Sequence, residues 1–303
     1  MRVAIGPSSF AEQDKTPLEL LVSSHIEVIP NPYGRRLNLE ETIKHLTDVD
    51  GLIAGLEPLG REVLESSPRL KVIARVGIGM DNIDLEAAAE LGIKVSNTPE
   101  GPTDAVAEMC LTALLAVKRK LLAFNADLHE GTWKKRIGNG LRDCVVMLIG
   151  YGRIGQRFGE HLRYFGAKLL VCDQNITQAG LSRGERLVSL DEGLPLADVV
   201  SLHADGSDVI LGKTEFEKLK PGAILLNSAR GVLVDEDALV GALENNAIAG
   251  AWLDVYREEP YNGPLVSFGQ VMLTPHVSTY TVQCRRSMEE SAVLNLLRDL
   301  DIS

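Results

Sequence analysis

Short apolar runs alternate with helically spaced apolar positions along the first hundred residues. The runs predict strands at 2–6, 26–30, 51–55, 71–75 and 93–96. Between them, the spacing of apolar positions predicts helices near 17–23, 39–46, 60–66 and 84–91. Strands that alternate with helices in this way are typical of a parallel sheet covered by helices.

The same alternation returns in the second half of the chain. Apolar runs predict strands near 145–149, 168–172, 198–202, 223–227, 249–254 and 271–274. This set matches the strands of a doubly wound dinucleotide-binding fold. We therefore predict an α/β protein with two doubly wound parallel-sheet domains, one flavodoxin-like and one of the Rossmann type.

Two further helical segments accompany these halves. A turn signal at 97–102 is followed by apolar positions at helical spacing over roughly 103–130, which predict one helix about 40 Å long. The segment 281–299 is also helical and is expected to fold back onto the first domain. The expected domains are thus 1–97 plus 281–303, for substrate, and 98–280, for a dinucleotide.

Composition narrows the class of protein. The 303 residues are 45% hydrophobic and 24% charged, as in a soluble globular protein. A net charge of −11 argues against a nucleic-acid-binding surface. No apolar stretch reaches the ~20 residues of a membrane helix, and the N-terminus lacks the apolar core of a secretory signal. A cytoplasmic protein with neither nucleic-acid nor membrane partners is expected.

The cysteines and histidines show no metal-ligand spacing. Cys110, Cys144, Cys172 and Cys284 are widely separated and form no C-x-x-C pair, so we expect reduced core thiols in a cytosolic protein. The six histidines show no H-x-x-x-H pattern. No metal is expected.

A glycine motif follows the apolar run 145–149. Gly150, Gly152 and Gly155 fit the G-x-G-x-x-G spacing between a predicted strand and a predicted helix. The first glycine permits a tight turn, the second lets a pyrophosphate approach the backbone, and the third lets helix and strand pack closely. The helix N-terminus then offers N–H groups to the phosphates.

An acidic residue follows at the spacing of a ribose contact. The run 168–172 ends in Asp173, which lies 18 residues beyond Gly155. A carboxylate there can accept hydrogen bonds from a ribose hydroxyl but repels a 2′-phosphate. The motif therefore predicts NAD rather than NADP as cofactor.

Chemically active side chains follow the later strands of this half. Because ligands gather beyond the carboxyl ends of parallel strands, these side chains are expected on the cofactor's edge of the sheet. An imidazole suits proton exchange near neutral pH, and a nearby carboxylate favours its charged form. An arginine can bind a substrate carboxylate in two places. The residues concerned are His203, Arg230, Asp254, Glu259 and His276.

Several motifs together resemble a known family, the NAD-dependent D-2-hydroxyacid dehydrogenases, and within it the phosphoglycerate dehydrogenase branch. The segment 226–231 resembles the family's arginine motif, 253–260 its glutamate motif and 273–276 its histidine motif. The segment 75–84 is similar to the loop that holds the substrate carboxylate with backbone N–H groups. The match extends from about 70 to 280 and is looser before that.

The resemblance implies a role for each matching residue. Arg230 would bind the substrate, His276 would be the acid/base, and Glu259 would tune the histidine. Substrate contacts are further expected at Arg75, Val76 and Gly77. The matching cofactor positions are Ile78, Thr103, Gly150, Gly152, Arg153, Ile154, Gly155, Asp173, His203, Ser228, Ala229 and Asp254. The family also implies a cleft between the domains, closure on substrate, and a homodimer around the long helix.

Three departures from the family pattern leave the substrate open. The segment 204–208 replaces the usual Pro-Leu after His203, 277–280 replaces glycines after His276, and Gly55 stands where a phosphate-binding arginine is expected. A 2-hydroxy acid such as 3-phosphoglycerate is the leading expectation, supported by Arg75. The alternatives are a reductase of an unphosphorylated acid such as glyoxylate, hydroxypyruvate or pyruvate, and a non-catalytic NADH-sensing protein.

Overall fold

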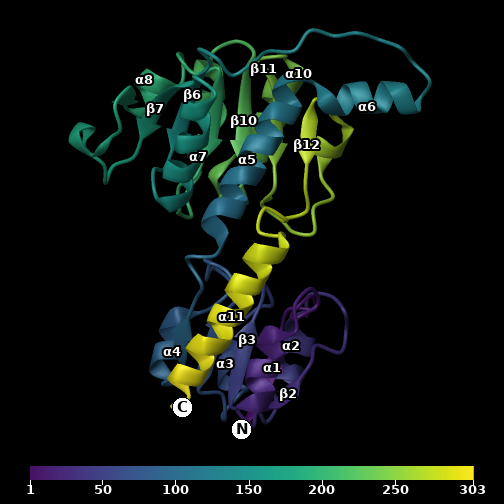
Figure 1. Cartoon of the computed structure of the whole chain (residues 1–303), viewed down its shortest axis with the longest axis vertical. Coiled ribbons are helices and arrows are strands. Elements are labelled where there is room, and N and C mark those ends of the chain that lie inside the picture. Colours follow the sequence, from purple (N-terminus) through teal and green to yellow (C-terminus); the bar gives the residue numbers. More distant parts are fainter. Residues whose placement is uncertain (303) are drawn as a thin grey trace. The chain divides into compact units, whose positions relative to one another are not determined.

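A computed structural model describes residues 1–302 of the chain and divides it into two compact units. The first unit combines Met1–Pro102 with the C-terminal segment that begins at Tyr280, and the second is Thr103–Thr279. Figure 1 shows both units, each with its own sheet.

The sheet of the first unit has five parallel strands. They are β1 (Arg2–Ile5), β2 (Glu27–Ile29), β3 (Gly51–Ala54), β4 (Val72–Arg75) and β5 (Lys94–Ser96), in the order β2-β1-β3-β4-β5. This is the flavodoxin-like order. Two of the three inner strands, β3 and β4, are buried along their whole length, as expected for strands covered on both faces.

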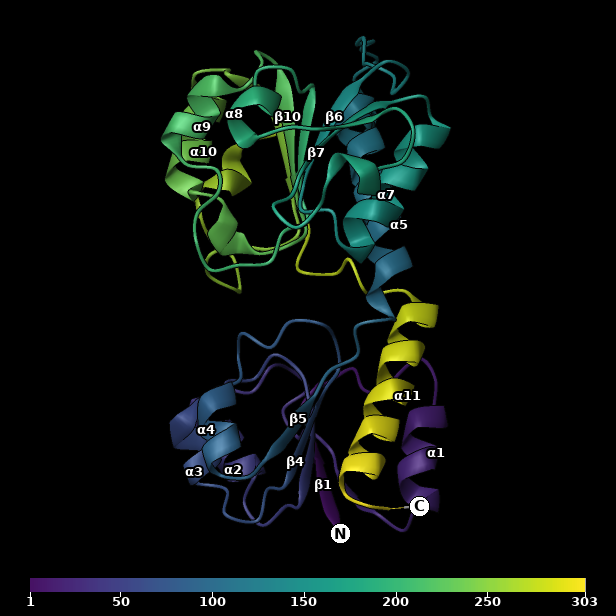
Figure 2. The same ribbon diagram turned by 90° about the vertical axis from the view of Figure 1, so that its left-hand side faces the viewer.

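Helices cover both faces of this sheet (Figure 2). One face carries α2 (Leu39–His45), α3 (Arg61–Glu65) and α4 (Leu85–Glu90), and the other carries α1 (Thr16–Ser23) and α11 (Val282–Asp299). The C-terminal helix α11 packs on β3, β4 and β5, so the expectation that it folds back onto the first domain is confirmed. Its buried stripe, Met288, Ala292, Val293 and Leu296, has helical spacing.

The sheet of the second unit has seven parallel strands in the order β12-β11-β10-β9-β6-β7-β8. Six of them follow the Rossmann order, which confirms the predicted fold class. The strands are β6 (Val145–Ile149), β7 (Lys168–Cys172), β8 (Glu185–Leu187), β9 (Val199–Leu202), β10 (Ala223–Asn227), β11 (Ile248–Leu253) and β12 (Val271–Leu273).

Helices again lie on both faces of the sheet (Figure 2). The side chains of α5 (Pro102–Lys118) and α7 (Arg153–Tyr164) form one core layer, in which Cys110, Phe158 and Trp252 are fully buried. The opposite face carries α8 (Leu190–Gly193), α9 (Lys213–Lys218) and α10 (Glu236–Glu244). Short 3₁₀ turns lie at Gln178–Gly180, Gly231–Leu233 and Pro264–Ser267.

The prediction of a single helix over 103–130 is wrong in one respect, because the structure has two helices there. The helix α5 ends at Lys118, and α6 begins at Leu121 and ends at His129. Lys120 between them has a φ of 56°, a left-handed conformation that ends an α-helix. The apolar spacing predicted helix correctly on both sides but carried no sign of this break.

The structure gives no indication of a membrane span or a metal site. Across residues 1–302, no helix is both long and apolar enough to cross a bilayer. The same residues contain no group of three or more His, Cys, Asp or Glu side chains arranged to hold a metal ion. All four cysteines are free thiols, and burial raises the pKa of Cys110 to about 12 and that of Cys284 to about 11.

Candidate active site

The strand order of the second unit brings the chemically active loops to one edge of its sheet. All the strands are parallel, so their carboxyl ends share that edge. The loops after β10, β11 and β12 are neighbours there and carry Arg230, Glu259 and His276. The chain order reverses between β6 and β9, which is where such sheets bind ligands.

The glycine loop has the form that a dinucleotide needs. Gly150 has a φ of 90°, and a Cβ there would collide with the backbone of Ala204. A Cβ on Gly155 would lie 2.5 Å from the carbonyl oxygen of Gly150. Gly152 faces open space, and as N-cap of α7 it supplies no side chain to the helix N–H groups. The loop can therefore receive a pyrophosphate on its backbone.

Asp173 lies against this loop. Its carboxylate accepts hydrogen bonds from the backbone N–H of Tyr151 at 2.7 Å and of Asn175 at 2.8 Å. The side chain is only partly buried. A partly exposed carboxylate beside the glycine turn is placed as the predicted ribose contact requires.

His203 lies in an apolar setting at the end of β9. Its ring is 5.4 Å from that of Phe158, and its Nε2 is 2.9 Å from the hydroxyl of Ser201. Burial lowers the pKa of His203 to about 4. This imidazole is therefore neutral near pH 7 and is suited to packing and hydrogen bonding.

His276 and Glu259 form the pair expected from the sequence. His276 Nδ1 is 3.0 Å from Glu259 Oε2, and the two side chains are 42% and 24% exposed. Since a carboxylate only accepts, Nδ1 carries the proton and Nε2 is left for another partner. His276 has a φ of 55°, a strained conformation that often marks functional residues.

Asp254 holds the loop on which His276 stands. Its carboxylate is fully buried and accepts hydrogen bonds from the hydroxyls of Thr274 (2.6 Å) and Ser278 (2.5 Å). The backbone N–H groups of Val277 and Ser278 also donate to it, each at 2.9 Å. Both carboxylate oxygens of Asp254 are thus occupied by the segment 274–278, which favours a positioning role over direct cofactor contact.

Arg230 stands at the end of β10. Its Nη1 donates to the carbonyl oxygen of Ala229 at 2.8 Å, and its Nη2 is 3.6 Å from Asp205. A Cβ on the next residue, Gly231, would collide with the backbone of Tyr256. The loops that carry Arg230 and Glu259 are therefore in close backbone contact.

The first unit has its own loop after β4, and its hydrogen bonds bear on one expectation. The N–H groups of Val76 and Gly77 donate within the unit, to Ala54 O at 2.9 Å and to Thr98 Oγ1 at 2.8 Å. Both residues are buried, whereas Ile78 and Gly79 are partly exposed. Within residues 1–302, the N–H groups of Ile78 and Gly79 make no hydrogen bond to protein. The anion contact predicted at Val76 and Gly77 stays a prediction.

Arg75, the other expected substrate contact, is buried. The residue is 8% exposed and its Nη1 donates to the carbonyl oxygen of Val76. A Cβ on Gly77 would lie 2.7 Å from the same nitrogen, so the guanidinium occupies space that glycine leaves free. This arginine is folded onto its own loop.

The remaining expected cofactor residues surround the glycine loop and the neighbouring strand ends. Thr103 lies in the first turn of α5, and Arg153 and Ile154 open α7. Ser228 and Ala229 follow β10, and the Ser228 hydroxyl is 3.2 Å from the Cys110 thiol on α5. All five are at least partly exposed, as a ligand contact requires.

Sequence reasoning missed the side chains that hold the His276 loop. Thr274 bridges Asp254 and the indole N–H of Trp252, the latter at 2.9 Å. Tyr256 donates to the Thr274 carbonyl oxygen at 2.9 Å and stacks on Tyr261. Ser278, one of the residues that replace the family's glycines after His276, donates to Asp254 and is buried. Only the repetition of hydroxyl residues near His276 could have indicated these contacts.

Comparison with known proteins agrees with this geometry. Residues 111–278 match the family model of the NAD-binding domain of D-isomer-specific 2-hydroxyacid dehydrogenases. The chain is 36% identical over 270 residues to a glyoxylate reductase of Thermococcus litoralis, covering 84% of this chain and 82% of that protein. It is 37% identical over 241 residues to a D-3-phosphoglycerate dehydrogenase of Mycobacterium bovis, covering 77% of this chain but 46% of that longer protein.

A solved structure supports the same assignment. The TT0316 protein of Thermus thermophilus is 35% identical and superposes with a TM-score of 0.91 over 99% of this chain and 97% of its own. Family model, relatives and fold thus agree on one family. The chain belongs to the D-2-hydroxyacid dehydrogenase family and is an NAD-dependent oxidoreductase.

Proposed function

We propose that this enzyme reduces a small unphosphorylated 2-oxo acid, of the glyoxylate or hydroxypyruvate class, to the D-2-hydroxy acid. The observation that carries the proposal is the Glu259–His276 pair at the carboxyl edge of the NAD-binding sheet, next to the loop of Arg230. A sensor of NADH needs no such proton-transfer pair. The identity of 36% to a glyoxylate reductase supports the substrate class.

The glycine loop, Asp173 and the loop after β10 would hold the cofactor. When bound, NADH supplies the hydride that reduces C2 of the substrate. His276 Nε2 donates the proton that the carbonyl oxygen requires, while Glu259 keeps Nδ1 protonated and holds the ring. Arg230 binds the substrate carboxylate and polarises the carbonyl group.

The state of Arg75 favours an unphosphorylated substrate. A phosphate needs an accessible cation, and Arg75 is buried and bonded to its own backbone. Gly55, at the other expected phosphate position, has no side chain to offer. Its N–H instead donates to the buried carboxyl group of Glu57 at 2.9 Å.

A 3-phosphoglycerate dehydrogenase is the second candidate. It is favoured by the identity of 37% to the D-3-phosphoglycerate dehydrogenase of Mycobacterium bovis. Oxidation of NADH with glyoxylate, hydroxypyruvate, pyruvate and 3-phosphohydroxypyruvate, followed by absorbance, decides between the two. We expect the highest kcat/KM on an unphosphorylated acid. A higher kcat/KM on 3-phosphohydroxypyruvate would overturn the proposed substrate class.

We also propose that the enzyme is a cytoplasmic homodimer that associates through residues 121–140, called the arm below. The arm consists of α6 and the segment that returns to β6, and in Figure 1 α6 extends away from the second unit's sheet. Its exposed apolar side chains include Leu121, Leu128, Trp133 and Ile137, the last two 81% and 90% exposed. Large exposed apolar side chains in one segment are typical of an interface. Free buried thiols fit a reducing compartment.

A further inference from the structure

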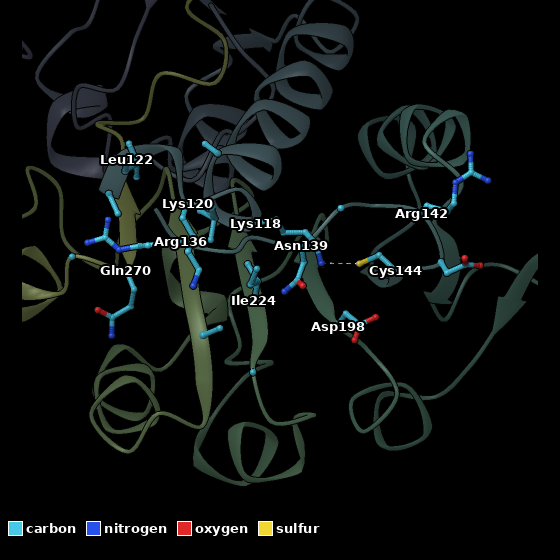
Figure 3. Close-up of a pocket in the computed structure, with 18 residues that line it drawn as sticks. Lys118, Lys120, Leu122, Arg136, Asn139, Arg142, Cys144, Asp198, Ile224 and Gln270 are labelled. Carbon is cyan, nitrogen blue, oxygen red and sulfur yellow. Dashed lines mark hydrogen bonds between the residues drawn. The ribbon is translucent and has the colours of Figure 1, made fainter. Parts of the chain in front are cut away.

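A cavity of about 800 Å³ lies in the second unit, away from the proposed catalytic loops (Figure 3). Its walls include Asp198, Gly222 and Gln270, which directly precede β9, β10 and β12. These residues mark the amino ends of the strands, the edge opposite to the glycine loop. The end of α5, the start of α6 and the segment 136–144 complete the walls. The cavity is therefore distinct from the NAD and substrate sites.

Lys118, the last residue of α5, is a buried cation in the wall of this cavity. The residue is 8% exposed. Its Nζ donates to the Sγ of Cys144 at 3.2 Å, the interaction drawn in Figure 3. Burial raises the pKa of Cys144, so the thiol to which Lys118 donates is uncharged. A buried ammonium in that situation is costly unless an anion accompanies it.

The carboxylates near the cavity already have partners. Asp198 accepts from Lys220 Nζ at 2.6 Å and from the Val145 N–H at 2.9 Å. Burial alone would raise the pKa of Asp198, but these bonds and the charges of Lys220 and Lys118 lower it. Two ammonium groups thus share this one carboxylate. Asp143 is likewise paired, since its Oδ1 lies 3.3 Å from the Nζ of Lys168.

Further cations add to the positive charge at the cavity. Lys120 and Arg142 line the cavity, and within residues 1–302 neither makes an ion pair. Arg136 also lines it but is paired with Asp127. The cavity is therefore net positive in a chain whose net charge is −11. Such a local reversal of charge favours an anionic ligand.

The rest of the wall is apolar and indicates what accompanies the anionic group. The apolar lining residues are Ala116, Val117, Leu122, Ala123, Ile224 and Ala249. A volume of this size is typical of small-molecule sites. We propose that the cavity binds a small organic anion, with its phosphate or carboxylate on Lys118 and its apolar body against this wall.

Calorimetric titration of the full-length enzyme tests the proposal, with phenyl phosphate, benzoate and inorganic phosphate as probes in separate arms. We expect phenyl phosphate or benzoate to bind, and phenyl phosphate to bind more tightly than inorganic phosphate because the ring is buried. Lys118→Met should weaken binding at least about tenfold, since a charge-assisted hydrogen bond is lost. Arg142→Gln, on the exposed rim, should also weaken it.

Two further variants locate the probe. Arg230→Gln should leave cavity binding intact, whereas a probe bound at the catalytic edge would lose affinity in Arg230→Gln and keep it in Lys118→Met. Lys213→Met removes an exposed lysine of α9 outside the cavity and should change nothing. Binding that Lys118→Met leaves unchanged, equal affinity for phosphate and phenyl phosphate, or no binding of any probe would overturn the assignment.

The unfolding temperature gives a second readout. Without a probe, Lys118→Met should unfold at the wild-type temperature or above it, because the variant removes a buried charge that shares the carboxylate of Asp198 with Lys220. The probe should raise the unfolding temperature of the wild type but not of Lys118→Met. A lower unfolding temperature of Lys118→Met without any probe would show that the protein itself compensates the lysine, and would contradict the proposal.

Discussion

Two histidines at the same sheet edge illustrate how environment decides the role of a residue. Burial beside Phe158 lowers the pKa of His203 to about 4, so this ring stays neutral. His276 is 42% exposed and its Nδ1 is 3.0 Å from the carboxylate of Glu259. Of the two, only His276 has both an exposed ring and a carboxylate that holds that ring by a hydrogen bond. We therefore place proton transfer on His276.

Asp205 competes for the proposed substrate-binding arginine. It belongs to the unusual segment 204–208, and its carboxylate is 3.6 Å from Arg230 Nη2. A substrate carboxylate must share or displace this contact. Asp205→Ala should therefore lower the KM for glyoxylate about two- to fivefold, the range expected from an exposed ion pair. Initial rates at varied glyoxylate concentration measure the effect.

Asp208→Ala is the matched control, since Asp208 lies in the same loop and is also exposed. Its KM should stay at the wild-type value, which separates the contact with Arg230 from a general change in loop charge. If Asp205→Ala and Asp208→Ala had the same KM as the wild type, Asp205 would have no part in substrate binding.

At the scale of single residues, the sequence predicted which residues belong to the candidate site better than it predicted their hydrogen bonds. Glu259 and His276 were expected as a pair and lie within hydrogen-bond distance. Val76 and Gly77 were expected as anion donors, but their N–H groups bond to Ala54 and Thr98. Such bonds join segments far apart in the chain, so no local pattern indicates them.

At the scale of elements, the break between α5 and α6 has the largest consequence. It ends the core helix at Lys118 and directs residues 121–140 away as an arm with exposed apolar side chains. The proposed dimer depends on this arm. Leu121 and Leu122 of the arm continue the helical spacing of the apolar positions in α5, so the sequence pattern by itself predicts a continuation of the buried helix.

Removing the apolar side chains of the arm should dissociate the dimer. The double variant Trp133→Ser/Ile137→Ser removes the two most exposed apolar side chains of the arm. Size-exclusion chromatography with light scattering should give twice the chain mass for the wild type and the chain mass for the variant. The measured mass should fall because the double variant loses apolar side chains that the dimer interface would bury.

A control from outside the arm is Tyr164→Ser, which removes a side chain that is 96% exposed on α7. It should remain dimeric. A monomeric wild type would contradict the dimer itself, and a dimeric double variant would contradict the arm as its interface.

The strand β8 shows where element prediction from sequence fails. It has three residues and begins with the buried Glu185. The carboxylate of Glu185 can be buried because it has polar partners in Tyr151 and Arg163. An apolar run is the signal for a buried strand, and here a buried charge replaces it. The C-terminal helix α11, with its regular buried stripe, was predicted nearly to the residue.

At the scale of the whole molecule, burial of His203 links stability to pH. The folded-state pKa of about 4 lies below the value of about 6.5 in the unfolded chain, so the unfolded state binds the proton more readily. Stability is therefore full above pH 6.5 and falls as the pH drops from 6.5 towards 4. This one group should cost about 2 kcal/mol of unfolding free energy between pH 7 and pH 5.

Denaturant unfolding at the two pH values tests this contribution. His203→Gln keeps a hydrogen-bonding group for Ser201 but does not titrate. The loss of unfolding free energy from pH 7 to pH 5 should be smaller in His203→Gln than in the wild type by about 2 kcal/mol. Equal losses in both proteins would contradict this, because they would show that protonation of His203 does not contribute to the loss of unfolding free energy.

The architecture of the whole molecule follows from repeated local patterns. Both sheets are parallel, and in both units the polar site residues stand at the carboxyl ends of the strands. The alternation of strands and helices was sufficient to predict two doubly wound domains. It carried no information on the cavity at the amino ends, whose walls come from α5, the arm and three strand starts.

The kinetics of His276→Ala test the central claim, that the Glu259–His276 pair transfers the proton in reduction of a 2-oxo acid by NADH. The account predicts a kcat on glyoxylate lowered about 10²-fold or more, with NADH affinity by fluorescence titration close to the wild-type value. A kcat equal to that of the wild type would contradict it.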